Sequence, residues 1–134
     1  MAKILIIDDE KVIAELLKLN FEREDYEVFT AADGIEGLEI IRKIIFDLII
    51  LDVLMPRMDG FQFYKEMKRL PSTSQIPLLV MTVRGAMRDS FEGLGVEAFI
   101  NKPFEIDDIV EHVKKILSRN HSTVSSISLS LSPR

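Results

Sequence analysis

Short apolar runs and amphipathic stretches alternate five times along this chain, and the alternation restricts the fold more than any other feature. The apolar runs are residues 3–7, 27–31, 48–51, 78–82 and 98–101. Each precedes a stretch with apolar residues at helical spacing, for example Val12, Ile13, Leu16, Leu17 and Phe21, and later Ile35, Leu38, Ile41 and Ile45. The pattern predicts an α/β fold in which five helices cover both faces of a parallel sheet, because parallel strands need crossover connections.

Size and composition fit one globular domain. The chain has 134 residues, of which 47% are hydrophobic and 29% charged. No apolar stretch reaches the ~18 residues that span a bilayer, and the first apolar run is too short for a signal peptide, so we expect a cytoplasmic protein without a membrane partner. The absence of cysteine excludes disulfide and thiolate chemistry.

Charge separates the body of the chain from its end. Residues 1–118 carry 15 basic and 22 acidic side chains, which argues against direct nucleic-acid binding by this domain. Residues 119–134 are rich in Ser and contain no acid. We therefore expect one domain over residues 1–118, followed by a tail that is either a truncated linker or, because Ile127, Leu129 and Leu131 alternate with Ser, an edge strand.

Chemically useful side chains stand at the ends of four predicted strands. Asp8 and Asp9 follow the first strand, Asp52 follows the third, Thr82 ends the fourth and Lys102 follows the fifth. The second strand ends at Ala31 and offers no such group. In open α/β sheets, ligands bind outside the carboxyl ends of the strands, so these side chains are expected to share one edge.

Three carboxylates held together repel one another unless a cation lies among them. Mg²⁺ commonly takes one or two carboxylates and shares phosphate oxygens. Aspartate is also an established phosphoryl acceptor, and the phosphoryl oxygens would find partners in the metal, the Lys102 ammonium and the Thr82 hydroxyl. The cluster therefore predicts a Mg²⁺-dependent phosphoryl site on Asp52.

Each of these residues also has a purely structural interpretation. Asp8 and Asp9 are typical of the start of a helix, and Glu10 suits either a helix first turn or a contact to metal-bound water. Asp52 alone would be a turn residue, Lys102 a solvated side chain and Thr82 a strand residue. Their joint placement at the expected strand ends favours the functional interpretation.

Four ordered segments resemble the signature motifs of the response-regulator receiver family. They are "ILIIDDE", "DLIILDVLMPRMDG", "VMTVRG" and "FINKPF", and the resemblance extends from Lys3 to about Leu117. It implies a flavodoxin-like, doubly wound five-stranded sheet in the order 2-1-3-4-5. It also implies a switch of a two-component system, in which a histidine kinase or phosphotransfer protein phosphorylates Asp52.

The resemblance assigns further roles. Mg²⁺ would be bound by Asp8, Asp9, Asp52 and the main-chain carbonyl of Leu54, with Asp9 and Asp52 favoured as direct ligands. Thr82 and Lys102 would contact the phosphoryl group, Phe99 would be the switch aromatic, and the Lys102–Pro103 bond would be cis. Output would pass to a downstream protein or a missing effector domain, and the family also allows phosphorylation-dependent dimerisation. Catalysis would be limited to slow autophosphotransfer and autodephosphorylation.

Some features depart from the family pattern and keep two alternatives open. Val83 stands where Ala is common, Phe99 lacks the hydroxyl of the more usual Tyr, and the interval from Thr82 to Lys102 is short. One alternative is an unphosphorylated pseudo-receiver that only binds a partner. The other is a Mg²⁺-dependent aspartyl phosphohydrolase, which Leu54 disfavours because that class has an acid/base Asp two residues after the nucleophile.

Overall fold

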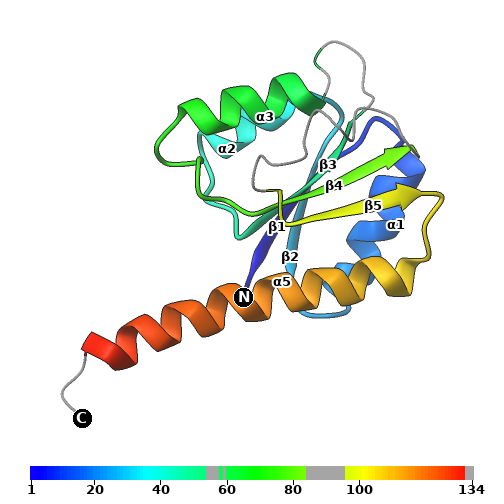
Figure 1. The fold of residues 1–134 in the computed structure, drawn as a ribbon. Coiled ribbons are helices and arrows are strands. Elements are labelled where there is room, and N and C mark those ends of the chain that lie inside the picture. The colour runs from blue at the N-terminus through cyan, green and yellow to red at the C-terminus, as the bar shows by residue number, and fades with distance from the viewer. Residues whose placement is uncertain (54–57, 59, 84–95, 132–134) are drawn as a thin grey trace.

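A five-stranded parallel sheet forms the centre of the protein (Figure 1). The structure, a computed structural model, describes residues 1–53, 58, 60–83 and 96–131. The strands lie in the order β2-β1-β3-β4-β5. Their bounds are β1 (Lys3–Ile7), β2 (Glu27–Ala31), β3 (Leu48–Asp52), β4 (Leu78–Val83) and β5 (Ala98–Lys102). The predicted fold class and strand order are confirmed.

Helices cover both faces of this sheet (Figure 1). The described residues contain α1 (Lys11–Glu22), α2 (Gly34–Ile41), α3 (Gly60–Arg69) and α5 (Ile106–Leu131). Helices α2 and α3 pack on one face, while α1 and α5 pack on the other. The fifth helix that the sequence predicts, between β4 and β5, falls on residues 84–95, which lie outside the described residues. None of the described helices is long and apolar enough to cross a membrane.

The central strands are hydrophobic because both of their faces are covered. All five residues of β3 are buried, and so are four of the five residues of β1. Alternate residues serve opposite faces: Leu5 and Ile49 pack with α2 and α3, whereas Ile4 and Ile50 pack with α1 and α5. Burial on both sides explains why these strands show continuous apolar runs rather than alternation.

Several apolar residues that stand at helical spacing are exposed rather than in the core. In α1 the buried residues are Ala14, Leu17 and Phe21. Val12 and Leu16 are 81% and 45% exposed, because α1 contacts the sheet along a stripe narrower than its apolar surface. Ile45 is 80% exposed because α2 ends at Ile41.

The Ser-rich tail is helical over most of its length. Helix α5 continues to Leu131, so residues 119–131 do not form the edge strand that the alternation of Ile, Leu and Ser allowed. The boundary between a domain at residues 1–118 and a separate tail remains a prediction.

A glycine brings the start of α3 close to the carboxyl end of β3. The Gly60 amide donates to the Val53 carbonyl at 2.8 Å. A Cβ at Gly60 would lie 2.8 Å from the Val53 Cα and 3.0 Å from the Asp52 carbonyl oxygen, and backbone atoms cannot rotate away. Gly60 therefore permits the close approach that carries the chain from Asp52 into α3.

We expect Gly60→Ala to lower the free energy of unfolding by about 1–3 kcal/mol, because the added methyl group overlaps backbone. Urea denaturation at pH 7 measures the change. Gly34→Ala is the matched control, since Gly34 also begins a helix but its Cβ would meet the Met58 side chain, which can move. Equal losses of stability in the two variants would contradict this account of Gly60.

Candidate functional site

The sheet brings three charged residues to its carboxyl edge. Asp8 directly follows β1, Asp52 ends β3 and Lys102 ends β5. The strands are parallel and in register, with Ile7 beside Leu51, Asp52 beside Met81 and Val83 beside Lys102, so their ends meet at one edge. The Lys102 Nζ lies 3.3 Å from Asp8 Oδ2 and 3.2 Å from Asp52 Oδ2. The sequence-based expectation of a shared edge is met by these three side chains.

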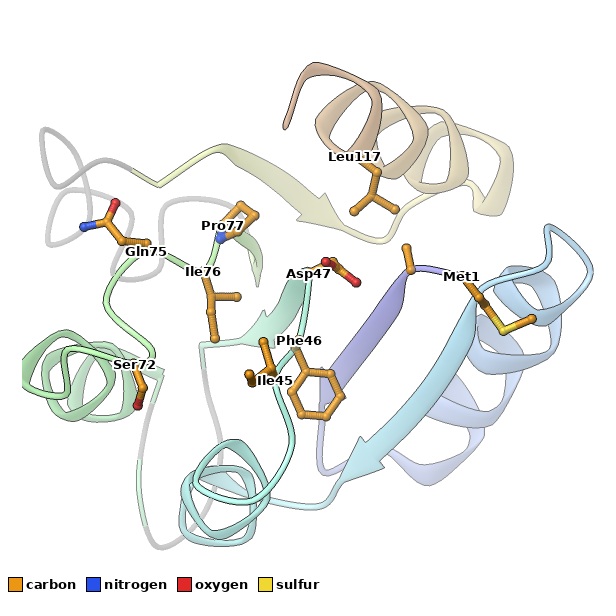
Figure 2. A pocket seen from close by; sticks show the side chains of 10 residues that line it. Met1, Ile45, Phe46, Asp47, Ser72, Gln75, Ile76, Pro77 and Leu117 are labelled. Atoms are coloured by element: carbon orange, nitrogen blue, oxygen red, sulfur yellow. The ribbon is translucent and has the colours of Figure 1, made fainter. Parts of the chain in front are cut away.

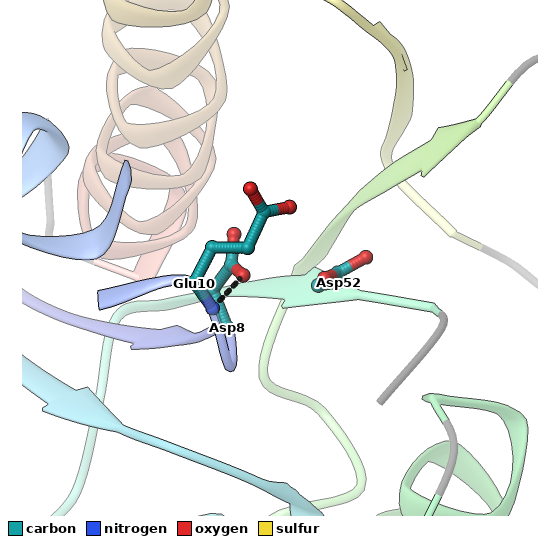
Figure 3. Close-up of side chains that lie close together, drawn as sticks. All are labelled: Asp8, Glu10 and Asp52. Carbon is teal, nitrogen blue, oxygen red and sulfur yellow. Dashed lines mark hydrogen bonds between the residues drawn. The ribbon is translucent and has the colours of Figure 1, made fainter. Parts of the chain in front are cut away.

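A third carboxylate completes the cluster. Lys102 Nζ also lies 3.2 Å from Glu10 Oε1. One carboxylate oxygen from each of Asp8, Glu10 and Asp52 falls within 4.8 Å of the others. Figure 3 shows Asp8 and Glu10 on the segment after β1 and Asp52 on β3. Asp8 and Asp52 are 2% and 5% exposed, while Glu10 is exposed. The acidic cluster thus has two buried members and one at its mouth.

Local hydrogen bonds fix the segment after β1. The Asp8 amide donates to the Ala31 carbonyl at 3.1 Å, which extends the pairing of β1 with β2 by one residue. The Asp8 Oδ1 accepts from the Glu10 amide at 2.8 Å, so this carboxylate orders the turn into α1. Glu10 is the N-cap residue of α1 but makes no side-chain cap. Its carboxylate contacts Lys102 instead.

The structure places the other predicted site residues as follows. Asp9 is exposed and is not part of the acidic cluster, whereas Glu10, which the sequence left open, is part of it. Thr82 pairs with Asn101 at the end of β4, so its backbone reaches the same edge. Leu54 lies outside the described residues. Phe99 is half-buried in β5 against the core, and the Lys102–Pro103 peptide bond is cis.

Burial and mutual repulsion shift the ionisation of the cluster. The pKa of the Asp52 carboxyl is raised to about 7, first by burial and second by the neighbouring Asp8 carboxylate, while the Lys102 ammonium opposes the rise. Burial lowers the pKa of Lys102, but the carboxylates of Asp52 and Asp8 outweigh it and hold that pKa above its ordinary value. A protonated Lys102 alone therefore does not compensate for the acidic cluster.

The donor set fits a hard divalent cation. Three carboxylates face one ammonium, and oxygen atoms from different residues lie close enough to share an ion. Mg²⁺ binds such sites through one or two carboxylates and keeps several waters, which the exposed side of the cluster would admit. The residues present thus form a possible acidic Mg²⁺-binding site.

Comparison with known proteins identifies the family. The family model for the response regulator receiver domain matches residues 4–114, and the chain belongs to this family. It is similar to the DNA-binding dual master transcriptional regulator RpaA of Synechocystis, with 36% identity over 121 residues. That match covers 89% of this chain and 50% of RpaA, so the chain spans about half the length of this relative.

Solved structures of response regulators with 32% sequence identity to this chain share its fold. The chemotaxis response regulator CheY4 of Vibrio cholerae has a TM-score of 0.81 and 32% identity, covering 87% of this chain and 98% of that chain. The response regulator TrrA of Thermotoga maritima, solved in complex with Mg²⁺-BeF, has a TM-score of 0.77 and 32% identity, covering 87% and 99% of the two chains.

Without metal, we expect Asp52 to make the protein less stable as pH rises. The unfolded chain loses the Asp52 proton near pH 4, but the folded protein keeps it to about 7. Between these values the folded state binds more protons, so the free energy of unfolding falls with increasing pH. Asp52→Asn should remove this fall and add about 1–3 kcal/mol at pH 8.

Urea denaturation in metal-free buffer from pH 4 to pH 8 tests this expectation. Asp25→Asn is the matched control, because it makes the same substitution at an exposed carboxyl just after the C-terminal end of α1. Asn tolerates the positive φ of 66° at this position. A pH dependence that is the same in Asp52→Asn and in the wild type would contradict the assigned pKa.

Proposed function

We propose that this receiver domain is a phosphorylation-activated switch of a two-component system, and that Asp52 accepts the phosphoryl group. The observation that carries the proposal is the convergence of Asp8, Glu10 and Asp52 on the Lys102 ammonium at the carboxyl edge of the sheet. Family membership supports the class of signalling protein, and it supports a phosphoacceptor rather than an enzyme that turns over a substrate.

The proposed reaction transfers a phosphoryl group from phosphohistidine. An Asp52 carboxylate oxygen forms a bond to phosphorus while the bond from phosphorus to the histidine nitrogen breaks, and the departing imidazole takes up a proton. Asp52 is buried at the end of a buried strand, which limits the freedom of its carboxylate. Lys102 would neutralise charge that develops on the phosphoryl oxygens.

Mg²⁺ would supply a second positive centre for those oxygens. Asp8 and Asp52 are the buried carboxylates that would bind the metal. The third carboxylate ligand, on the exposed side of the site, would be either Glu10 or Asp9. Glu10 already faces the site, whereas Asp9 would have to turn inward to bind. The Leu54 carbonyl remains a proposed ligand on the basis of the family resemblance.

Readout of phosphorylation is proposed to involve Thr82 and Phe99. Thr82 stands at the end of β4, one strand from Asp52, and would contact the phosphoryl group. Phe99 lines two pockets of about 350 and 550 Å³ beside α5, so a rotation of its ring would change the surface there. A small energetic bias at Asp52 would then shift the population between two packings of this face.

We propose one partner that donates the phosphoryl group and another that receives the signal. A histidine kinase or phosphotransfer protein would dock on α1, where Val12, Leu16 and Leu19 form an exposed apolar stripe beginning two residues after Glu10. A downstream target or an effector domain would receive the signal. The half-length match to RpaA is compatible with an effector domain in a longer protein.

We expect acetyl phosphate with Mg²⁺ to add one phosphoryl group to the wild-type chain and none to Asp52→Asn, as measured by intact mass. Omitting Mg²⁺ or replacing Lys102 with Ala should reduce labelling at least about tenfold, because each removes positive charge from the phosphoryl oxygens. Asp9→Asn and Glu10→Gln should differ in their Mg²⁺ requirement, which identifies the ligand at the exposed position.

Three outcomes would contradict the proposal. Labelling of Asp52→Asn as strong as that of wild type would place the phosphoryl group elsewhere. No labelling and no Mg²⁺ binding would favour the unphosphorylated pseudo-receiver. Multiple turnovers on small phosphoesters would favour the phosphohydrolase.

A further inference from the structure

The ammonium of Lys102 has no hydrogen-bond donor left over for a phosphoryl oxygen. Its Nζ lies 3.3 Å from Asp8 Oδ2 and 3.2 Å from both Glu10 Oε1 and Asp52 Oδ2, which is as many partners as an ammonium has N–H groups. The Lys102 side chain is only 12% exposed, so water has little access to it. A phosphoryl oxygen therefore binds Lys102 only after one of these acids has given up its place.

Glu10 is the acid that Lys102 can release most easily. Asp8 is buried, and its other carboxylate oxygen accepts from the Glu10 amide at 2.8 Å, the hydrogen bond drawn in Figure 3. Asp52 is buried at the end of β3. The side chain of Glu10 is 57% exposed, so water solvates its carboxylate as soon as it leaves Lys102. Displacement by a phosphoryl oxygen should therefore occur at Glu10.

Binding of Mg²⁺ would not by itself free Lys102. An ionised carboxylate accepts on both of its oxygens, so Asp8 and Asp52 can contact a metal and the Lys102 ammonium together. The contact between Glu10 and Lys102 then has to break in a separate event, when the phosphodonor arrives.

Glu10 also lies where a phosphodonor would enter. It is the exposed member of the acidic cluster, whereas Asp8 and Asp52 are buried behind it. The oxygens of a phosphodonor are negatively charged, so the Glu10 carboxylate repels them at short range. Glu10 thus opposes the donor in two ways, by occupying Lys102 and by its own charge, and the repulsion grows with the charge of the donor.

The opposite edge of the sheet offers a phosphodonor no comparable site. A pocket of about 570 Å³ lies there, at the amino ends of the strands, where Asp47 precedes β3 and Pro77 precedes β4 (Figure 2). The described lining of this pocket includes the Asp47 carboxylate and no Lys or Arg side chain. The positive charge that attracts a donor is therefore that of Lys102, and Glu10 controls access to it.

We propose that Glu10 is a specificity-determining residue for phosphorylation of Asp52, which competes with the phosphoryl oxygens for Lys102 and thereby disfavours doubly charged phosphodonors. The inference rests on the proposed function and deepens it by naming the donors that the site selects against. Glu10 takes no part in the bonds that form and break. In this account Asp9, rather than Glu10, is the third carboxylate ligand of the metal.

Labelling by small phosphodonors at saturating Mg²⁺, followed by intact mass over time, tests this role. Acetyl phosphate is doubly charged near pH 7, whereas phosphoramidate is singly charged. We expect Glu10→Gln to raise the rate constant for acetyl phosphate at least about fivefold, because a neutral amide holds Lys102 less tightly and does not repel the donor. The rate constant for phosphoramidate should rise less, so the ratio of the two should increase at least about twofold, and about 0.5 M NaCl should reduce this increase.

Glu15→Gln is the matched control. It makes the same substitution at an exposed position of α1 that is not among the contacts of Lys102, and it should leave both rate constants as in the wild type. The fold should tolerate Glu10→Gln, because the Glu10 side chain does not cap α1. Calorimetric titration with Mg²⁺ alone separates the two acids: affinity should stay within about threefold in Glu10→Gln and fall at least about tenfold in Asp9→Asn.

Each contrary result has a distinct meaning. With a wild type that is labelled on Asp52, an acetyl phosphate rate that does not rise in Glu10→Gln would overturn the role of Glu10 and leave the proposed function standing. An equal rise for both donors, or the same rise in Glu15→Gln, would overturn the selection by charge. A tenfold loss of Mg²⁺ affinity in Glu10→Gln would make Glu10 a metal ligand instead. A wild type without any labelling would overturn the proposed function and this inference with it.

Discussion

The functional edge of this protein depends on one ammonium that faces three carboxylates. Lys102 Nζ lies 3.2–3.3 Å from oxygens of Asp8, Glu10 and Asp52, and two of these acids are buried. One positive charge does not offset this cluster, since the pKa of Asp52 is raised to about 7. The imbalance is a reason for the site to bind a divalent cation, because the cation supplies the positive charge that the cluster lacks.

The rest of the fold holds these groups in place. The strands β1 and β3 are buried on both faces, so the residues at their ends have little freedom to separate. Gly60 lets α3 begin directly against the backbone after Asp52, and the Asp8 carboxylate orders the turn into α1. A site of this kind, built on strand ends rather than on long loops, is positioned before any ligand arrives.

Much of this arrangement was predictable because parallel strands end at a common edge. That rule alone placed Asp8, Asp52 and Lys102 together once the apolar runs were recognised. The role of Glu10 was left open between a helix first turn and a contact to metal-bound water, because the direction of its side chain depends on the hydrogen bond from its amide to Asp8. Helical spacing also did not show that Val12 and Ile45 are exposed, since periodicity does not tell how wide a stripe the sheet covers or where a helix ends. The edge-strand alternative for the tail was wrong, because alternation of Ile127, Leu129 and Leu131 with Ser does not by itself exclude a helix.

The central claim is that the acidic cluster is completed by a divalent cation, and the ionisation of Asp52 tests it most directly. The carboxyl carbon of Asp52 can be followed by NMR across pH, assigned by comparison with Asp52→Asn. We expect a titration near pH 7 in metal-free buffer and below about pH 5 in about 10 mM Mg²⁺, because a bound cation favours the charged carboxylate. A titration midpoint that Mg²⁺ leaves unchanged would contradict the account.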